Sequence, residues 1–148
     1  MIQVKRLTET AIMPLRAYPE DAGWDLFCDI SLVDNCVWIQ PGERVLLKTG
    51  CSFAIPKGYY GRIADRSGNA WKFGLHVLGG VIDSKYRGEV MVVLLNTNKL
   101  EYCVKTGDKI AQMIITRISR KPMMEVDSFK EDLTDNKRGT FGFGSSGK

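Results

Sequence analysis

Short apolar or alternating runs, separated by turn residues, dominate the pattern of hydrophobic and polar positions along this chain. Alternation of apolar and polar residues is typical of β-strands with one buried face. The runs predict strands over Ile2–Leu7, Trp24–Ile30, Val37–Ile39, Arg44–Thr49, Tyr59–Ile63, Val90–Leu95, Tyr102–Val104 and Lys109–Arg117. Turn residues separate them at Pro41-Gly42, Pro56-Lys57-Gly58, Asn96-Thr97-Asn98 and Thr106-Gly107-Asp108. Strands at this spacing favour an all-β sandwich or jelly roll.

One brief helix is expected at Gly68–Phe73, with Ser67 as its cap and Gly74 as its terminator. Neither an internal repeat nor a linker divides the 148 residues, so they predict one domain. Residues 127–137 are polar and weakly patterned, and we expect them to tether the C-terminal tail to the folded body.

The tail, Arg138–Lys148, combines four glycines with an arginine, two phenylalanines and two serines. Glycine N–H groups, serine hydroxyls and a guanidinium can surround an anion, and a phenyl ring can cover a base. The tail is therefore interpreted as a flexible arm that closes over a ligand bearing phosphate and a base. A disordered terminus is the alternative. Its Gly142-x-x-x-x-Gly147-Lys148 spacing matches a P-loop, but no hydroxyl residue follows the lysine and no helix is expected there.

Two further segments carry candidate chemistry. In Gly61–Gly68, Arg66 and Ser67 would face an anion at the start of the helix, or else Ser67 only caps it and Arg66 pairs with an acid. Gly79–Glu89 resembles a hairpin that brings backbone close to a ligand.

Within that hairpin, Asp83 follows a β-branched pair and would face a pocket from a strand end, or else act as an ordinary turn aspartate. Tyr86 is either part of the same pocket or a core residue, and Arg87 with Glu89 could form a surface pair.

Composition narrows the function classes. Hydrophobic residues make up 44% and charged residues 26% of the chain, as in ordinary soluble proteins. The net charge of +4 is dispersed, and no stretch reaches membrane-spanning length, so neither a nucleic-acid nor a membrane partner is expected. Four cysteines without a C-x-x-C pair, and a single histidine, argue against zinc and for an intracellular protein whose cysteines are small core residues. His76 is expected to fill a strand position rather than to serve a catalytic triad.

Five segments, in order, resemble the motifs of the trimeric deoxyuridine triphosphate nucleotidohydrolase (dUTPase) family. They are Ala22–Leu26, Gly61–Gly68, Gly80–Glu89, Gly107–Gln112 and the tail. The resemblance implies a jelly roll or distorted β-barrel with one short helix. It divides the chain into a β domain at 1–137 and a flexible glycine-rich arm at 138–148.

The resemblance also implies a reaction. The enzyme hydrolyses dUTP to dUMP and pyrophosphate, with Mg²⁺ on the triphosphate, which supplies dUMP for thymidylate synthesis and keeps uracil out of DNA. Asp83 would be the general base for the attacking water, and Asp25 would hold water ligands of the metal. The substrate-binding residues that the resemblance implies are Arg66, Ser67, Gly68, Gly80, Val81, Ile82, Tyr86, Gln112, Arg138, Phe143, Gly144, Ser145 and Ser146.

Each of these residues has an implied part. Arg66, Ser67, Gly68 and Gln112 would contact the phosphates, and Tyr86 the deoxyribose. The backbone from about Leu75 to Ile82 would read the uracil edge. In the tail, Phe143 would cover the uracil, and Arg138, Ser145 and Ser146 would hold the γ-phosphate. The family further implies a homotrimer with shared sites, in the cytoplasm or nucleus of a cell or of a virus-infected host.

Four positions depart from the family pattern. Asp65 stands where proline is common, and could orient Arg66, assist the metal or repel the triphosphate. Phe141 replaces a usual glycine, Lys85 a frequent acid, and Ser146 a threonine. Two other activities stay open: a dCTP deaminase of the same fold, and a regulatory protein that binds dUTP without turnover, for which Asp65 and Phe141 are the motivation.

Overall fold

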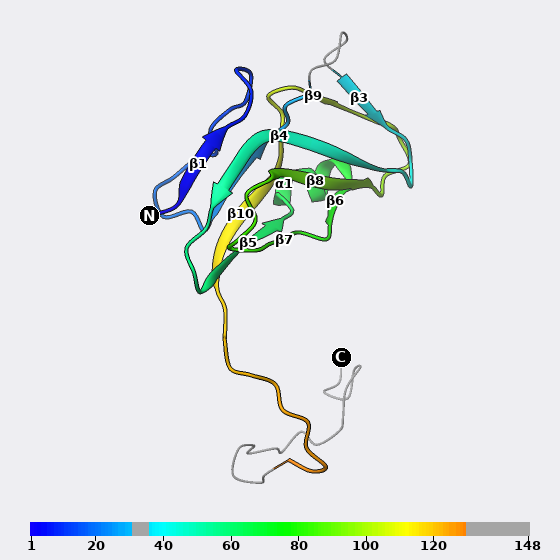
Figure 1. The fold of residues 1–148 in the computed structure, drawn as a ribbon. Helices are drawn as coiled ribbons and strands as arrows, with labels where there is room; N and C mark the ends of the chain where they lie inside the picture. Colours follow the sequence, from blue (N-terminus) through cyan, green and yellow to red (C-terminus); the bar gives the residue numbers. More distant parts are fainter. Residues whose placement is uncertain (31–35, 130–148) are drawn as a thin grey trace.

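Two four-stranded antiparallel sheets form the body of the molecule in the computed structural model, which describes residues 1–30 and 36–129 (Figure 1). One sheet has the order β1-β4-β8-β6, the other has the order β2-β10-β5-β7, and β3 pairs with β9 in a small third sheet. The strands are β1 Gln3–Arg6, β2 Gly23–Phe27, β3 Cys36–Ile39, β4 Arg44–Ala54, β5 Tyr59–Ala64, β6 Leu75–Leu78, β7 Val81–Ile82, β8 Glu89–Asn96, β9 Tyr102–Lys105 and β10 Lys109–Arg117. This architecture confirms the predicted all-β jelly roll.

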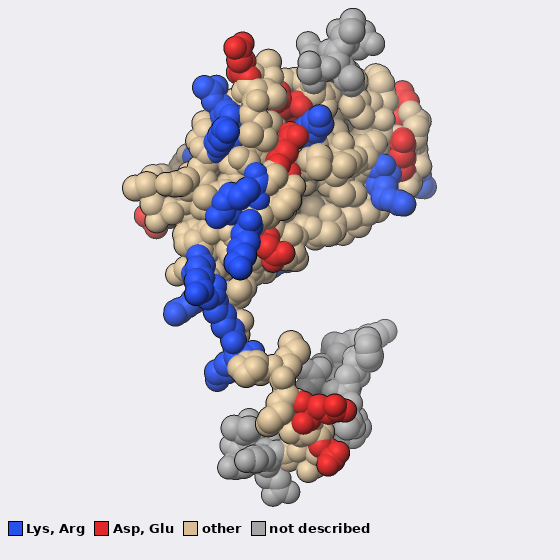
Figure 2. Space-filling model, viewed as in Figure 1, with Lys and Arg blue, Asp and Glu red and all other residues tan. Residues whose placement is uncertain are grey.

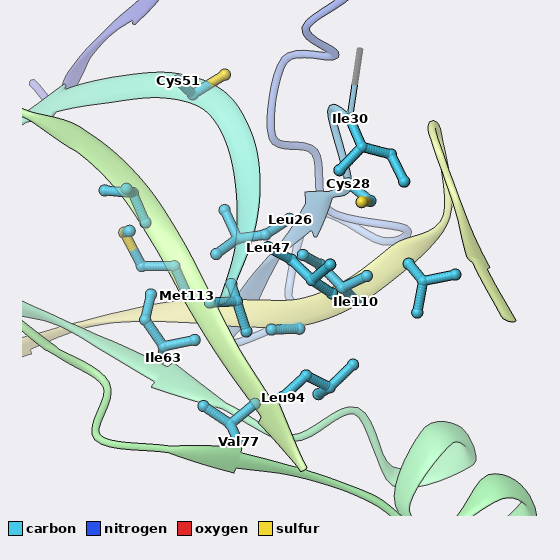
Figure 3. Close-up of a cluster of buried hydrophobic side chains, with 14 of the residues drawn as sticks. Leu26, Cys28, Ile30, Leu47, Cys51, Ile63, Val77, Leu94, Ile110 and Met113 are labelled. Atoms are coloured by element: carbon cyan, nitrogen blue, oxygen red, sulfur yellow. The ribbon is translucent and has the colours of Figure 1, made fainter. Parts of the chain in front are cut away.

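The core lies between the sheets because their inward residues alternate with outward ones. β8 shows this period of two over its whole length, and Val90, Val92 and Leu94 are almost completely buried. Figure 3 shows Leu47 and Met113, from opposite sheets, among the side chains of this cluster. Burial on this scale is the main stabilising term for the fold.

The strand predicted over Trp24–Ile30 ends at Phe27, and β4 and β6 differ further from the sequence prediction. β4 continues past Thr49 to Ala54 through an irregular stretch between Lys48 and Ser52, where Gly50 takes a φ of +63°. A glycine in such a run looks like a turn, but here it only bends the strand. β6 was not predicted as a strand, although His76 does occupy a strand position, as expected.

Helix α1 spans Ser67–Phe73 and is the one helix within the described residues. Its cap is Arg66, in an extended conformation and without a side-chain capping bond, so the prediction that Ser67 caps the helix is wrong. Gly74 ends the helix with a φ of 65°, as predicted, and its N–H donates to the Ala70 carbonyl. None of the helices described is long and apolar enough to cross a bilayer.

The cysteines divide into two pairs. Cys28 and Cys51 are free and buried, as predicted. Cys36 and Cys103 instead form a disulfide that links β3 to β9, so the core assignment is wrong for these two. Trp38 is the register partner of Cys103, so Cys36, two residues before Trp38, lies diagonally across the strand pair from Cys103. The two cysteines are close only because β3 pairs with β9.

Candidate active site

β10 brings three of the motifs together because it lies between β2 and β5. Gln112 on β10 is the register partner of both Asp25 on β2 and Ala64 on β5. The chain leaves β5 directly into Arg66 and the start of α1. The result is a polar pocket of about 310 Å³, lined by Ala17, Asp21, Ala22, Gly23, Asp25, Arg66, Ser67, Gly68 and Gln112.

Asp25 is the electrostatic centre of the polar pocket. Its side chain is nearly buried, and Arg66 Nε and Lys109 Nζ each lie 2.8 Å from one of its two oxygens. Asp21 is a second carboxylate in the lining, so the two cations balance the acidic groups, and the guanidinium of Arg66 offers charged N–H donors to an anionic ligand. Lys109 was not among the predicted site residues. Its place in the fourth motif is the one signal that could have identified it.

Gln112 is held in place by its neighbours. Its Nε2 donates to the Asp65 carbonyl oxygen at 2.7 Å. A Cβ on Gly23 would collide with the Gln112 side chain, so only glycine leaves room for this arrangement. The second N–H of the amide remains able to donate to a ligand.

The start of α1 faces the same pocket through Ser67 and Gly68. The first N–H groups of a helix have no partners inside it, so they are available to an anion. Asn69 Nδ2 donates to the Lys109 carbonyl at 2.8 Å and ties this turn to β10.

A second candidate region lies on the segment Gly79–Glu89, which follows β6 and contains β7. The prediction that it forms a hairpin of paired strands is wrong, because β6 pairs with β8 whereas β7 pairs with β5 in the other sheet. We use hairpin only as a name for this segment. Gly79 and Gly80 turn the chain with φ values of +73° and +96°. The Ile63 N–H donates to the Gly80 carbonyl at 2.8 Å, and a Cβ on Gly80 would lie 2.7 Å from the Ile63 oxygen. Glycine is therefore required at position 80 both for its φ and for this close approach.

Asp83 follows β7 directly and is exposed, as the strand-end prediction requires. It lines a hairpin pocket of about 230 Å³ together with Leu46, Val81, Ile82, Tyr86, Glu89 and Met91. The Tyr86 N–H donates to the Asp83 carbonyl at 3.0 Å, which makes Asp83 the first residue of a tight turn as well.

Tyr86 is 42% exposed, so it lines the pocket and is not a core residue. Its hydroxyl donates to the Glu89 carbonyl at 2.9 Å. Arg87 donates to the carbonyls of Ser84 and Tyr86, whereas the Glu89 carboxylate accepts from Gly50 N, so the alternative of an Arg87–Glu89 pair is wrong.

The two candidate pockets are separate in this chain. The polar pocket and the hairpin pocket have no lining residue in common. The predicted tail residues Arg138, Phe143, Gly144, Ser145 and Ser146, and the departure at Phe141, lie outside the described residues.

The side chains of the polar pocket could bind a metal ion only through water molecules. Within residues 1–30 and 36–129, no cluster of three or more His, Cys, Asp or Glu side chains could hold a metal ion. Both oxygens of Asp25 already have cationic partners. A hard divalent ion that keeps its waters and is bound chiefly by a triphosphate remains compatible with this pocket.

The dUTPase family model matches residues 9–147. This chain belongs to the dUTPase family. It is 45% identical over 144 residues to the deoxyuridine 5'-triphosphate nucleotidohydrolase of Paramecium bursaria Chlorella virus 1, covering 97% of this chain and 96% of the relative. It is 47% identical over 143 residues to the enzyme of the same name from Mus musculus, covering 97% of this chain and 83% of the relative.

Solved dUTPase structures share the fold. A Staphylococcus bacteriophage 80alpha dUTPase mutant with dUpNHpp superposes with a TM-score of 0.88 at 28% identity, covering 100% of this chain and 99% of that one. A mutant dUTPase of phage phi11 of S. aureus, with a TM-score of 0.78 at 29% identity, covers 88% and 99% and is described with a structural Mg(II) ion.

Proposed function

We propose that this chain hydrolyses dUTP to dUMP and pyrophosphate. The observation that carries the proposal is the polar pocket, in which motifs far apart in the sequence bring Arg66, Gln112 and the start of α1 together around Asp25. The triphosphate lies in this pocket against Arg66, the first amides of α1 and the free N–H of Gln112. Membership of the dUTPase family supports the assignment of the nucleotide.

Asp83 is the general base of the proposed reaction. It accepts a proton from a water molecule as the water oxygen bonds to the α-phosphorus. The bond from that phosphorus to the bridging oxygen of pyrophosphate breaks, and dUMP is left. The position of Asp83 at the exposed end of β7 supports this role, because a carboxylate there can accept a proton from solvent-derived water.

The hairpin supplies selectivity in this proposal. The backbone from Leu75 to Ile82 reads the uracil edge, and Tyr86 lies against the deoxyribose. The internal hydrogen bonds of Gly80 and Tyr86 support this part, because they fix the loop before a substrate arrives.

Mg²⁺ accompanies the substrate in the proposed reaction and, when bound, it neutralises charge on the triphosphate oxygens. Asp25 would hold the metal's water ligands while it keeps its contacts with Arg66 and Lys109.

The functional assembly is proposed to be a homotrimer in which different subunits complete one site. The separation of the polar pocket from the hairpin pocket supports it. So does the extended segment 118–129, which runs away from the body with Met123, Met124 and Phe129 exposed (Figure 1).

An apolar pocket on the body is a suitable receiving surface for a neighbouring subunit. It has a volume of about 380 Å³ and is lined by Met1, Ile2, Val4, Met13, Pro14, Trp24, Phe53, Met113 and Ile115. Figure 2 shows Lys and Arg side chains gathered where the chain leaves the body. Arg117 at the end of β10, and Arg120 and Lys121 after it, are exposed. The tail then reaches a neighbouring site, where Phe143 covers the base and Arg138 with Ser145 and Ser146 holds the γ-phosphate.

One assay separates this function from its alternatives: product release from each dNTP and from UTP, with and without Mg²⁺. Pyrophosphate from dUTP alone, in the presence of Mg²⁺, is the expected result. Ammonia from dCTP would identify a deaminase instead. Tight dUTP binding without pyrophosphate release would identify a regulatory binding protein.

A further inference from the structure

Asp65 connects the two sheets with its side chain. One carboxylate oxygen accepts a hydrogen bond from the Val77 N–H at 2.6 Å, and the other lies 2.7 Å from His76 Nδ1. Because a carboxylate only accepts, the imidazole carries its hydrogen on Nδ1. The carboxylate faces β6 and Arg66 pairs with Asp25, so the hypothesis that Asp65 orients Arg66 is wrong.

Strand β6, to which Asp65 is hydrogen-bonded, has a free edge at Val77. β6 is the last strand of its sheet and pairs only with β8, so its outward N–H groups lack a strand partner. Asp65 follows β5 in the other sheet and supplies the missing acceptor to Val77.

This contact lies beside the hairpin. Val77 precedes Gly79 and Gly80 by only a few residues, and there the chain crosses from one sheet to the other. The β5 segment thus holds this part of the chain at three places: β7 pairs with β5, the Ile63 N–H donates to the Gly80 carbonyl, and Asp65 accepts from the Val77 N–H.

The main-chain carbonyl of Asp65 bonds to a residue that lines the polar pocket. The Asp65 carbonyl accepts from Gln112, and the next residue, Arg66, pairs with Asp25. Substituting the Asp65 side chain therefore alters the hairpin support and leaves the phosphate-side hydrogen bonds in place.

We propose that Asp65 is a positioning residue that fixes the base-reading hairpin and so raises selectivity for uracil. This inference rests on the proposed function, since it assumes that the hairpin reads the base. The support acts at the strand that enters the turn, and its loss would let Gly79 and Gly80 shift relative to a bound base.

The test compares Asp65→Ala and Asp65→Asn with the parent. We measure kcat and KM for dUTP, the kcat/KM ratio of dUTP to dCTP and to dTTP, the inhibition constant of inorganic tripolyphosphate, and Tm. Asp65→Ala should raise the KM for dUTP and lower the selectivity ratios by about tenfold, the effect of one lost hydrogen bond to a charged acceptor. Changes in kcat and in the inhibition constant of tripolyphosphate should stay within about twofold. The KM and the selectivity ratios of Asp65→Asn, which keeps one acceptor, should lie between those of the parent and those of Asp65→Ala.

His76→Ala provides an independent measurement if Asp65→Ala does not fold. It removes one partner of the carboxylate and should shift selectivity in the same direction by a smaller factor. The double variant should be no less selective than Asp65→Ala alone, because both changes break the same contact. Glu101→Ala, which removes an exposed carboxylate bonded to Gln40, is the matched control and should behave as the parent.

The outcomes separate the two proposals. A parent that releases no pyrophosphate from dUTP contradicts the proposed function. An active parent whose Asp65 and His76 variants lose Tm or kcat, yet keep the selectivity ratios, overturns the role of Asp65 alone.

Discussion

At the scale of single residues, the chemistry depends on carboxylates in unlike surroundings. Asp25 is nearly buried and held between two cations, whereas Asp83 is exposed at the end of β7. Both oxygens of Asp25 have cationic partners, so this carboxylate suits an organising role. The carboxylate of Asp83 is open to water, which is why the proposed reaction places the base at position 83.

Asp83→Asn should therefore abolish most turnover and spare binding. The amide occupies the same space but cannot take the proton, and loss of a positioned base costs about 10²–10⁴-fold in rate. Pyrophosphate release under saturating dUTP and calorimetric binding of a non-hydrolysable dUTP analogue measure the two effects. Glu101→Gln is the control for a carboxylate-to-amide change, and a parental rate in Asp83→Asn would disprove the assignment of the base.

The raised pKa of Cys28 predicts that the free energy of unfolding falls at alkaline pH. Burial, with a smaller effect from Asp108 and Asp29, raises the pKa of the Cys28 thiol to about 12. The thiol of an unfolded chain has a pKa of about 8.5. Between that pH and about 12, Cys28 is protonated in the folded state and deprotonated in the unfolded state. The resulting stability is complete below the unfolded pKa and is lost as pH rises towards 12.

Between pH 9 and 11, the free energy of unfolding of the parent should thus fall more steeply than that of Cys28→Ala. Urea titrations of both proteins at each pH measure this difference. Cys51, whose pKa is raised by burial as well, is unchanged in both proteins and does not affect the difference. Parallel pH curves would show that Cys28 titrates normally in the folded state.

At the scale of elements, strand pairing turns scattered motifs into pockets. Alternating runs predicted most strands well, because the period of two reports directly which face is buried. The continuation of β4 past Gly50 and the existence of β6 were missed, since glycines beside short runs look like turns. Neither the bond from Asp65 to Val77 nor the Cys36–Cys103 disulfide could be predicted, because each depends on how strands approach in space.

The candidate site shows the same division. The residue types of Arg66, Asp83 and Tyr86 pointed to phosphate and base chemistry, and the resemblance assigned their roles. The grouping of Arg66 with Lys109 around Asp25 was not predictable, because it follows from β10 lying between β2 and β5.

The hairpin provides a prediction with a built-in control. Gly79 and Gly80 both have positive φ, but only a Cβ at position 80 meets other atoms, at the Ile63 carbonyl. Gly79→Ala should cost roughly 1–2 kcal/mol of stability from the left-handed backbone alone. Gly80→Ala should cost more and also raise KM for dUTP, because it forces the hairpin away from β5.

Urea unfolding and steady-state kinetics of the two variants test this difference. Equal losses of stability and equal KM values would show that the close approach of Gly80 to Ile63 does not hold the hairpin.

At the scale of the whole molecule, the proposed reaction needs groups from both pockets. The polar pocket offers Arg66 and the first amides of α1, whereas the hairpin pocket offers Asp83 and Tyr86 without a cationic lining residue. A triphosphate and its attacking water need both kinds of group at once. A second copy that brings its hairpin to the polar pocket would supply them.

Deletion of residues 138–148 should leave a folded body that has lost most of its activity. The two sheets and their core are complete by Arg117, so the circular dichroism spectrum and Tm should stay near those of the parent. Turnover should fall because nothing then covers the bound nucleotide. Full activity in the truncated protein would rule out a role of the tail as a lid.

Mixing two inactive variants tests whether sites are shared. Arg66→Ala removes a cation from the polar pocket, and Asp83→Asn removes the base from the hairpin. If one site takes Arg66 from one subunit and Asp83 from its neighbour, each mixed trimer of the two variants regains about one of its three sites. Coexpression with two different tags, followed by purification on both, selects the mixed oligomers for the pyrophosphate assay.

The control is the same mixture prepared from separately purified, undissociated variants, which should remain inactive until subunits exchange. Restoration is possible only when intact halves from different chains meet, because each chain carries one damaged half. A mixed oligomer of confirmed composition that stays as inactive as its parents would mean that each chain completes its own site, and the two pockets would then have to close on one another within a single subunit.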